Sequence, residues 1–487
     1  MSTAGTAPLL VAANRGPVAF HRGPQGLVPR RGGGGLVSGL AAALVGSGAV
    51  WVCAPLSPED REAAAAAPEG RVDLAGHDTG GLAVSVVDVD PVTHDRAYND
   101  VANSTLWYLH HGLFSAPTTP VFDAGWRVGW QAYRDYAAVF AERVAAQAAP
   151  GAEVLVQDYH LALVPRLLRL LRPDVAVHHF SHTPWADAGS FAQLPADVAR
   201  AVCEGVLGAD SAGFLSRRWA LAFLDCCAAV LGARVDPDRL EVHHEGRTTR
   251  LVVLGLGVDA DALRARAHQP DVEAQCAALH ARVGDRQLLA RVDRAELSKN
   301  LLRGLAAYRE LLHRYPQWQG RVVHVLSVYP SRTDLADYRA YTAQVLELAR
   351  GIEAEFATPD WSPLVLELAD DLPRSLAVLR CADVLLVNPV RDGMNLVAKE
   401  GPVLSDRGVA LVLSREAGAW DDLAGDAVGV NPFDVGGTAE ALHAALSMTA
   451  DERRRATSRM AATAALMTPA AWLAAQRASL AGAVSRA

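Results

Sequence analysis

A run of charged residues in the second half of the chain follows an apolar segment. It extends from Arg291 to Asn300 (RVDRAELSKN) and contains Arg294 and Lys299 as well as Arg291. When a nucleoside diphosphate leaves a sugar, negative charge grows on its phosphate, and fixed Arg and Lys charges stabilise that transition state. The alternative interpretation is solvated surface charge, the ordinary role of an Arg/Lys run. The residue types predict an anion-facing cluster.

A second cluster, RDGMNLVAKEG at positions 391–401, follows another apolar segment. Asp392 and Gly393 form a turn, and the residues after them begin a helix whose first N–H groups are available to a ligand. Glu400 lies about two helical turns further on, where its carboxylate can accept hydrogen bonds from a ribose diol. This spacing predicts a nucleotide-sugar contact surface.

The two lysines of the chain fall in these two clusters. Of 46 Lys and Arg residues, only Lys299 and Lys399 are lysines. In a chain that otherwise uses arginine, a retained lysine indicates a place where a compact ammonium cannot be exchanged for a planar guanidinium. Chance is the alternative, and the coincidence with both clusters argues against it.

The first half of the chain has a glycine-rich segment, RRGGGGLVSGL, that begins at Arg30 and includes Gly35. Glycines that open a helix let backbone N–H groups approach an anion, and Arg15 and Arg31 favour such a site. The alternative is a tight strand–helix connection. The spacing is not GxGxxG, which speaks against a dinucleotide-dependent dehydrogenase.

Two polar clusters lie at predicted strand ends in the same half. Asp158 follows the strand Val154–Gln157, and His182 follows the strand Val175–Phe180. A carboxylate and a histidine at these positions are able to bind sugar hydroxyls or a phosphate, although a lone histidine more often satisfies its bonds inside a core.

Short β-branched segments alternate with longer Ala/Leu/Arg segments along the chain. Wholly apolar strands separated by amphipathic helices indicate parallel sheets covered on both faces, so the predicted class is α/β. The remaining predicted strands are Pro8–Ala13, Val50–Cys53, Leu251–Leu254, Gln287–Val292, Val322–Ser327, Val384–Asn388 and Ala410–Leu413. The main predicted helices are Asp135–Ala149, Ser216–Leu231, Leu301–Tyr315, Asp334–Ile352 and Asp451–Met467.

The strand–helix alternation restarts after a polar stretch, Asp236–Arg250, which we take as the approach to a domain boundary. We therefore expect one domain over residues 1–245, a second over 246–468, and a C-terminal helix over 469–487 that crosses back to the first domain. Ligands of open parallel sheets bind beyond the carboxyl ends of the strands, so two such domains facing each other form one cleft for two substrates.

Bulk properties limit the class of protein. The net charge of −8 gives no reason to expect a nucleic-acid or membrane partner, and the N-terminal segment resembles neither a leader nor a membrane span. The six cysteines show no CxxC spacing, which favours free thiols over a disulfide framework or a zinc site. We expect a cytoplasmic protein.

Together these motifs resemble the trehalose-6-phosphate synthase family of retaining glycosyltransferases. The resemblance extends from NRGP at residue 14 to NPFD at residues 431–434, and it rests above all on RDGMNLVAKE, supported by QDYH, HTPW and GFLSRRWALAFLDCC. It implies a GT-B architecture, in which two Rossmann-like doubly wound domains face a central cleft. The Arg- and Ala-rich composition is similar to that of actinobacterial members.

The resemblance also implies roles for individual residues. Catalytic roles fall on Arg291, Lys299, Asp158, His182 and Asp392; donor contacts on Gly35, Arg291, Lys299, Asp392, Gly393, Met394, Asn395, Leu396 and Glu400; and acceptor contacts on Arg15, Tyr98, Trp107, Asp158 and Arg332. No metal site is expected.

Two departures from the family pattern bear on these roles. Cys53-Ala54-Pro55 stands where many members carry a second tryptophan after the one at Trp51, which affects acceptor geometry. The segment from Arg291 to Lys299 is about three residues longer than the commoner Arg-Leu-Asp-Tyr-Ser-Lys form. Arg294 therefore competes with Arg291 for the diphosphate role.

The implied reaction transfers glucose from an NDP-glucose (UDP- or GDP-glucose) to glucose-6-phosphate and forms α,α-trehalose-6-phosphate with retention, without a cofactor or obligatory metal. Three alternatives stay open: a pseudo-glycosyltransferase that couples a nucleotide-linked cyclitol to an aminocyclitol phosphate, glucosyl transfer to another phosphorylated acceptor, and a non-catalytic sugar-phosphate sensor. The motifs specify neither the donor base nor the oligomeric state, and a homo-oligomer stays open.

Overall fold

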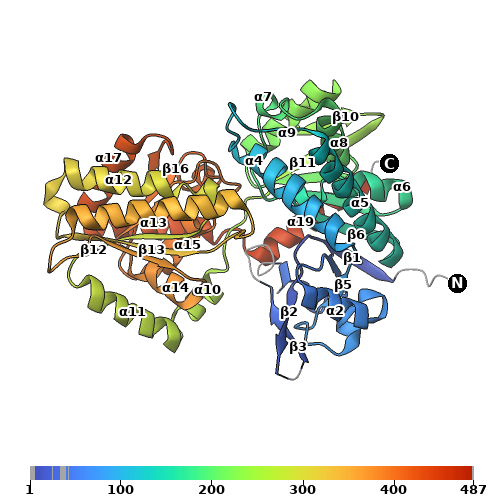
Figure 1. Ribbon diagram of the computed structural model, residues 1–487. Coiled ribbons are helices and arrows are strands. Elements are labelled where there is room, and N and C mark those ends of the chain that lie inside the picture. Colours follow the sequence, from blue (N-terminus) through green and yellow to red (C-terminus); the bar gives the residue numbers. More distant parts are fainter. Residues whose placement is uncertain (1–5, 25, 33–39, 42, 485–487) are drawn as a thin grey trace. The chain divides into compact units, whose positions relative to one another are not determined.

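A computed structural model describes residues 6–24, 26–32, 40–41 and 43–484, and the chain divides into two compact units (Figure 1). Unit 1 contains Met1–Gly255 together with Pro469–Ala487, and unit 2 contains Leu256–Thr468. Unit 1 thus draws on segments from both sides of unit 2 in the sequence.

Unit 1 is built on a nine-stranded sheet in the order β5-β4-β1-β6-β7-β8-β11-β10-β9. The strands from β5 to β11 run parallel, and β10 and β9 continue the sheet in antiparallel fashion. The strands are β1 Ala7–Ala12, β4 Val50–Cys53, β5 Ala83–Val86, β6 Ala148–Gln157, β7 Ala176–Ser181, β8 Ser211–Phe214, β9 Arg234–Asp236, β10 Glu241–His244 and β11 Arg247–Val253; β2 Val18–Gly23 and β3 Gly26–Arg31 form a separate hairpin.

The central strands of unit 1 are buried at consecutive residues, which means that both faces of the sheet are covered. The helices are α2 Pro58–Ala66, α3 Pro91–Asp95, the π-helical η3 Arg96–Leu106, α4 Trp107–His111, α5 Ala124–Gln147, α6 Val164–Leu171, α7 Ala188–Phe191, α8 Ala196–Leu207, α9 Arg217–Leu231 and α19 Pro469–Val484. The last of these, α19, packs on β6, β7 and β8.

Unit 2 is built on a six-stranded, wholly parallel sheet in the order β14-β13-β12-β15-β16-β17. The strands are β12 Gln287–Arg294, β13 Val322–Tyr329, β14 Leu364–Leu368, β15 Val384–Val387, β16 Ala410–Ser414 and β17 Val428–Val430. The helices are α10 Ala260–Ala267, α11 Pro270–Val283, α12 Leu301–Arg314, α13 Ala336–Phe356, α14 Leu372–Cys381, α15 Val397–Leu404, α16 Trp420–Leu423, α17 Val435–Ser447 and α18 Ala450–Ala464. Relative to β12 the strand order is 3-2-1-4-5-6, the order of a dinucleotide-binding Rossmann fold.

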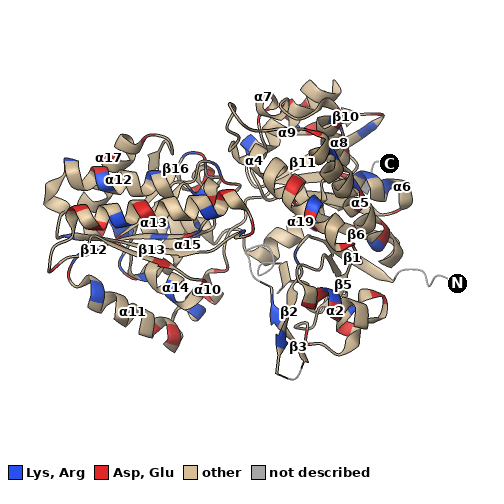
Figure 2. Ribbon diagram, in the orientation of Figure 1, with Lys and Arg blue, Asp and Glu red and all other residues tan. Residues whose placement is uncertain are grey.

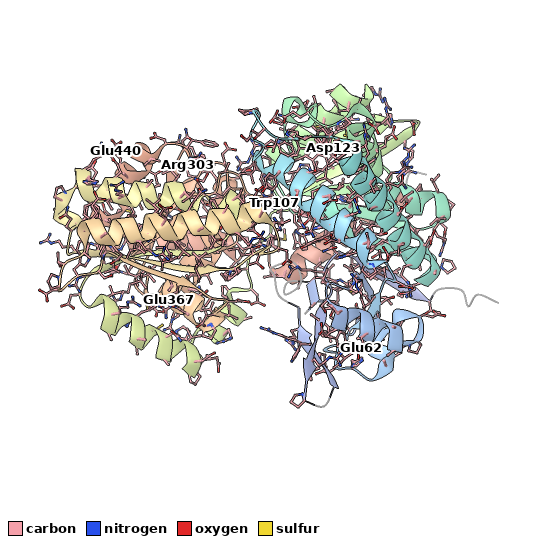
Figure 3. All side chains as sticks on the ribbon, viewed as in Figure 1. Glu62, Trp107, Asp123, Arg303, Glu367 and Glu440 are labelled. Atoms are coloured by element: carbon pink, nitrogen blue, oxygen red, sulfur yellow. The ribbon has the colours of Figure 1, made fainter. Side chains whose placement is uncertain are left out.

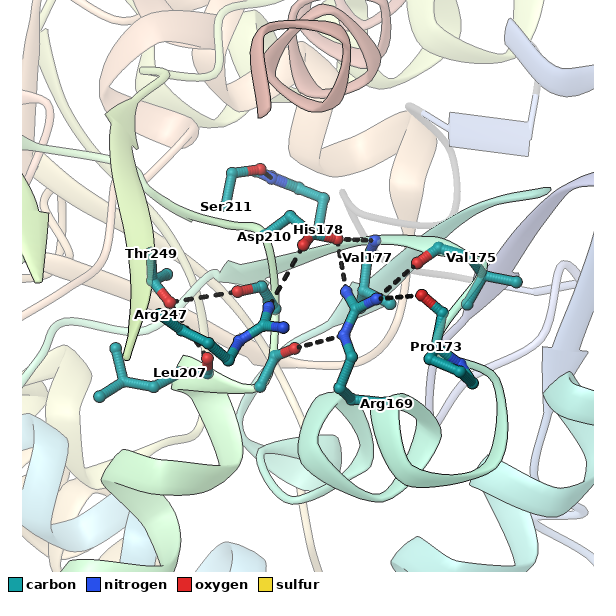
Figure 4. A network of polar contacts seen from close by, with 12 residues as sticks. Arg169, Pro173, Val175, Val177, His178, Leu207, Asp210, Ser211, Arg247 and Thr249 are labelled. Atoms are coloured by element: carbon teal, nitrogen blue, oxygen red, sulfur yellow. Dashed lines mark hydrogen bonds and ion pairs between the residues drawn. The ribbon is translucent and has the colours of Figure 1, made fainter. Parts of the chain in front are cut away.

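The boundary between the units lies after Gly255, not after residue 245 as expected from the polar stretch. The strand β11, which we expected to open the second domain, pairs with β8 of unit 1. A polar network fixes it there, because Asp210 accepts hydrogen bonds from Arg169 and Arg247, and the Thr249 hydroxyl donates to the Leu207 carbonyl at 3.0 Å (Figure 4). The charges at 236–250 therefore form a sheet edge and not a linker.

Charged residues of both signs are interspersed along the elements of each unit (Figure 2). Among the described residues, no helix combines the length and the apolar character needed to cross a membrane. All six cysteines are buried and free.

Candidate functional site

Each sheet has one place where the chain order reverses, and the sequence clusters lie at those places. In unit 2, β12 and β15 are neighbours although β13 and β14 lie between them in the sequence. In unit 1, β1 and β6 are neighbours in the same manner. Loops at the carboxyl ends of two such strands diverge and leave a crevice, which is where open α/β sheets bind their ligands.

Lys299 and Asp392 meet at the switch point of unit 2. The Lys299 Nζ atom lies 2.6 Å from Asp392 Oδ2, and the Asn395 side-chain amide donates to the same oxygen at 3.1 Å. Burial disfavours the charged ammonium, but the carboxylates of Asp392 and Asp293 outweigh it and raise the pKa of Lys299. The loops after β12 and β15 thus present a fixed cation and carboxylate, with exposed side-chain fractions of 12% and 16%.

Arg291 occupies the interior of unit 2, and the structure corrects its expected role. Its guanidinium donates to Asp293 at 3.0 Å, to the Asn388 side-chain oxygen at 2.6 Å and to the Lys299 carbonyl oxygen. The residue is 0% exposed. A cation with each guanidinium nitrogen engaged inside the protein ties β12 to the two loops and is not available to a ligand.

Arg294 is the accessible cation of the same segment. Its side chain is 45% exposed, and its guanidinium forms an ion pair with Glu296 at 2.8 Å. Arg294 stands five residues before Lys299, the spacing of Arg-Leu-Asp-Tyr-Ser-Lys, so the segment is not longer than the common form. The expectation of a longer segment was wrong because it was counted from Arg291, which is enclosed within β12, and not from Arg294, the partly exposed last residue of that strand.

Glu296 is a buried carboxylate that sequence reasoning did not single out. It is 1% exposed, forms an ion pair with Arg294, and accepts a hydrogen bond from the Ser331 hydroxyl at 2.9 Å. Burial opposes its charge, but Arg294, Arg332 and Lys299 outweigh burial and lower the pKa of Glu296 to about 2. The signal for Glu296 in the sequence was its position between Arg294 and Lys299, inside the predicted anion-facing cluster.

Arg332 lies next to this carboxylate in the turn after β13. Its backbone is left-handed (φ 45°), and its guanidinium donates to the Tyr338 hydroxyl and lies 5.5 Å from the centre of that ring. Ser331 joins the turn to Glu296. The structure therefore brings Arg332 together with Arg294 and Lys299.

The turn after Asp392 is held by the loop that follows β16. The Asp392 N–H donates to the Glu416 carbonyl, and the Ala419 N–H donates to the Met394 carbonyl at 2.8 Å. Gly418 lies so close to Gly393 that a Cβ atom there would overlap the Gly393 carbonyl oxygen. These bonds fix the backbone of the predicted donor loop.

The predicted donor residues differ in exposure. Met394 and Asn395 are buried, and Asn395 has a left-handed backbone (φ 71°), whereas Leu396 and Glu400 are half-buried. Burial alone raises the pKa of the Glu400 carboxyl to about 7. Glu400 is thus the titratable group of the cluster near neutral pH.

Lys399, the second lysine, has a structural role. Its Nζ atom donates to the Leu256 carbonyl at 2.7 Å and pairs with Asp422 at 2.6 Å, and the residue is 2% exposed. The ammonium therefore joins helix α15 to residue 256 and to α16. Only one of the two lysines faces the candidate site.

Asp158 and His182 meet at the neighbouring ends of β6 and β7 in unit 1. The His182 backbone N–H donates to Asp158 Oδ1 at 3.2 Å, and the Asp158 N–H donates to the Phe180 carbonyl at 2.7 Å. Asp158 has a left-handed backbone (φ 72°), which turns it sharply out of the strand. Burial and the neighbouring His179 lower the pKa of His182 to about 3, so its imidazole is neutral.

Of the acceptor residues predicted in the first half of the chain, the structure brings only some together. Tyr98 stacks between His94 and His160 with ring centroids 5.6 Å apart in each pair, and His160 Nδ1 lies 4.0 Å from Asp158. Tyr98 therefore lies beside Asp158. His160, part of the QDYH motif, completes this group; it belongs to the predicted polar cluster at the end of the strand but was assigned no role of its own.

Arg15 follows β1 at the switch point of unit 1 and has an exposed side chain, while its carbonyl accepts a hydrogen bond from the Trp51 indole at 3.0 Å. Trp107, on helix α4 (Figure 3), is 4% exposed and packs on His111, so little of its side chain is available to a ligand. Gly35 lies outside the described residues.

The model of glycosyltransferase family 20 matches residues 8–481. The bifunctional trehalose-6-phosphate synthase/phosphatase of Thermoproteus tenax is 35% identical over 92% of this chain, which spans 60% of that relative. The trehalose-6-phosphate synthase of Mycobacterium sp. (strain JLS) is 33% identical over 93% of this chain and 91% of its own length.

Solved structures resemble the chain over almost its whole length. The trehalose-6-phosphate synthase structure from E. coli bound with UDP-2-fluoro glucose has a TM-score of 0.83 and 26% identity, covering 97% of this chain and 98% of its own. The UDP-forming α,α-trehalose-phosphate synthase of Burkholderia vietnamiensis has a TM-score of 0.83 and 27% identity, covering 98% of each chain.

Proposed function

The chain belongs to glycosyltransferase family 20 and has the GT-B class of fold, and from this premise we propose that it is an α,α-trehalose-phosphate synthase. The reaction transfers glucose from a nucleoside-diphosphate glucose to glucose-6-phosphate. Uridine is the first base to test, because similar structures are described as UDP-forming or bound with a UDP-sugar analogue.

The observation that carries the proposal is the Lys299–Asp392 pair at 2.6 Å, at the switch point of a Rossmann-type sheet. In this proposal Lys299 and Arg294 bind the diphosphate and stabilise the charge that grows on it as it leaves. Asp392 binds hexose hydroxyl groups, and the backbone of Gly393, Met394, Asn395 and Leu396 contacts the donor. Glu400 accepts hydrogen bonds from the ribose.

The proposed chemistry proceeds with retention. The C1 hydroxyl of the acceptor attacks C1 of the donor glucose on the face from which the diphosphate departs. The new glycosidic C–O bond forms as the C–O bond to phosphate breaks, and the hydroxyl proton passes to the departing phosphate oxygen. This route needs no covalent enzyme intermediate, no cofactor and no obligatory metal, since Arg294 and Lys299 supply positive charge at the phosphate.

For the acceptor we propose Arg15 and Arg332 as phosphate ligands, because a guanidinium fork donates two parallel hydrogen bonds to a phosphate. Tyr98, Asp158 and His182 are proposed to contact sugar hydroxyls. Trp107 is not proposed as a direct acceptor contact, because it is 4% exposed and packs on Tyr108 and His111. Free thiols and small phosphorylated substrates favour the cytoplasm as the site of action.

A donor–acceptor matrix tests the proposal. UDP-, GDP- and ADP-glucose are each combined with glucose-6-phosphate, glycerol-3-phosphate, an aminocyclitol phosphate and free glucose, and the products are identified by mass spectrometry. We expect glucose-6-phosphate to be the best acceptor and free glucose a very poor one. If another phosphorylated acceptor is preferred, the product is not α,α-trehalose-6-phosphate and the proposed reaction is wrong. If no combination gives transfer, the protein is better described as a non-catalytic sugar-phosphate sensor.

A further inference from the structure

Helix α19 presents a row of polar and aromatic side chains to the sheet of unit 1. Trp472, Gln476 and Ser479 are spaced i, i+4 and i+7, which places them on one helical face. Trp472 and Gln476 are 1% and 0% exposed, and the ring of Trp472 lies 5.5 Å from that of His182. The terminal helix therefore forms part of the environment of a proposed site residue.

A chain of hydrogen bonds connects this helix to His182. The Gln157 amide nitrogen donates to Gln476 Oε1 at 3.2 Å, and Gln157 Oε1 lies 2.9 Å from His182 Nε2. Gln157 is the last residue of β6 and is itself 0% exposed. The nitrogen of the Gln157 amide therefore faces Gln476, and its oxygen faces His182.

The direction of this chain determines which imidazole nitrogen carries the proton. A carboxamide has a donor end and an acceptor end, so an amide that donates to Gln476 must present its oxygen to His182. The Nε2 atom then carries the hydrogen, and Nδ1 becomes the acceptor of the ring. A neutral ring follows from burial, which with the neighbouring His179 lowers the pKa of His182 to about 3.

Stability alone does not require two glutamines at these positions. Replacing both partners of a buried hydrogen bond by apolar groups of the same shape is often nearly neutral, whereas a buried amide left unpaired is destabilising. A paired amide chain does fix the orientation and the tautomer of a histidine at its end, as in catalytic groups in which a third residue orients the base.

We propose that Gln157 and Gln476 are positioning residues that hold His182 as the neutral Nε2–H tautomer, so that Nδ1 accepts a hydrogen bond from a sugar hydroxyl. The inference rests on the proposed function, which places His182 at a bound sugar. It assigns α19, a segment far from the other site residues in the sequence, a part in the chemistry.

The test compares two substitutions on the same face of α19. Gln476→Met removes the acceptor and keeps the length and volume of the side chain, which lets the Gln157 amide turn and donate to His182. Ser479→Ala is the matched control. The Ser479 hydroxyl donates to the Gln476 backbone carbonyl at 2.6 Å and contacts His178 at 3.1 Å and Ser211 at 2.9 Å, but among the described contacts it has none with His182 or with the Gln476 side chain. The tautomer of His182 is read from ¹⁵N chemical shifts, and kcat from steady-state assays.

We expect the wild-type enzyme to carry the His182 proton on Nε2. In Gln476→Met the proton should shift toward Nδ1, and kcat should fall about tenfold. This is the lower end of the loss seen when the residue that orients a functional histidine is removed. Ser479→Ala should leave tautomer and kcat unchanged. A wild-type Nδ1–H tautomer overturns the proposal even if the variant fails to fold, and so does a Gln476→Met enzyme with wild-type kcat. Full activity of His182→Ala would instead remove His182 from the proposed function.

Discussion

Two arginines that look interchangeable in the sequence have different environments. Arg291 is enclosed and bonds to Asp293, Asn388 and a carbonyl, whereas Arg294 is partly exposed beside Glu296. A lysine retains the positive charge but loses the planar fork. An Arg→Lys change should therefore affect the stability of the fold at position 291 and donor binding at position 294.

We expect Arg291→Lys to lower the free energy of unfolding by about 2 kcal/mol, because hydrogen bonds to a charged group contribute about 1.5–3 kcal/mol each. The folded fraction should retain its donor KM. Arg294→Lys should keep the melting temperature and raise the donor KM about tenfold, which corresponds to about 1.4 kcal/mol. Thermal denaturation and steady-state kinetics measure both. If instead Arg291→Lys raised the donor KM and Arg294→Lys lowered only the stability, Arg291 would be the residue that binds the diphosphate.

Glu400 makes donor binding depend on pH. Burial raises the pKa of its carboxyl to about 7, so the ligand-free group is protonated below pH 7 and ionised above it. Ribose hydroxyls donate to the ionised form, so binding of the nucleotide lowers the pKa of Glu400 and affinity rises with pH. We expect the dissociation constant of UDP to fall about tenfold between about pH 6 and pH 8, since each pH unit below the pKa costs a factor of about ten.

Isothermal titration calorimetry measures this change, and Glu400→Gln is the control because an amide does not titrate in this range. The difference between the two proteins isolates Glu400 from protonation of the nucleotide phosphate itself. Equal pH dependence in both proteins would exclude Glu400 from the ribose site.

At the scale of elements, a glycine contact sets the position of the donor loop. A Cβ atom on Gly418 would overlap the Gly393 carbonyl oxygen, whereas one on Gly425 meets nothing within 4 Å. We expect Gly418→Ala to displace the loop after β15 and lower kcat/KM for the donor at least tenfold, because small misplacements of binding groups are costly in rate. Gly425→Ala should behave as wild type. Wild-type kinetics of both variants would show that the loop tolerates displacement.

The alternation of short apolar strands with longer helices was the most predictable feature of the fold. The expected strands Val50–Cys53 and Gln287–Val292, for example, coincide with β4 and with most of β12, because the short, mainly apolar strands of a parallel sheet are distinctive in sequence. The hairpin β2–β3 was missed, since its burial is irregular and its residues are mixed. The assignment of β11 to the second domain was wrong because strand pairing between distant segments leaves no local signal.

The candidate site was predictable where a motif marks the end of a strand. Lys299, Asp392, Asp158 and His182 lie at such ends and meet in two pairs. Arg291 was misassigned because side-chain direction alternates along a strand, and the sequence did not show where β12 ends. Glu296 and Gln157 lie inside recognised motifs, but their contacts with Arg294 and with His182 depend on side-chain packing that the sequence does not show.

At the scale of the whole molecule, the two units share a doubly wound plan but carry different chemistry. Unit 2 has the 3-2-1-4-5-6 strand order and the cationic switch point, while unit 1 carries the carboxylate, histidine and tyrosine group. Helix α19 returns to unit 1 after unit 2 is complete. Each unit therefore carries residues to which the proposed function assigns a role.

The most direct test is the structure of the product formed from UDP-glucose and glucose-6-phosphate. We predict α,α-trehalose-6-phosphate, identified by NMR from two anomeric protons in the α configuration. We also predict that Lys299→Ala, correctly folded, forms the same product about 10²–10³ times more slowly, the loss expected for one preorganised electrostatic contact. A β-linked product, a different acceptor position, or wild-type turnover in Lys299→Ala would contradict the account.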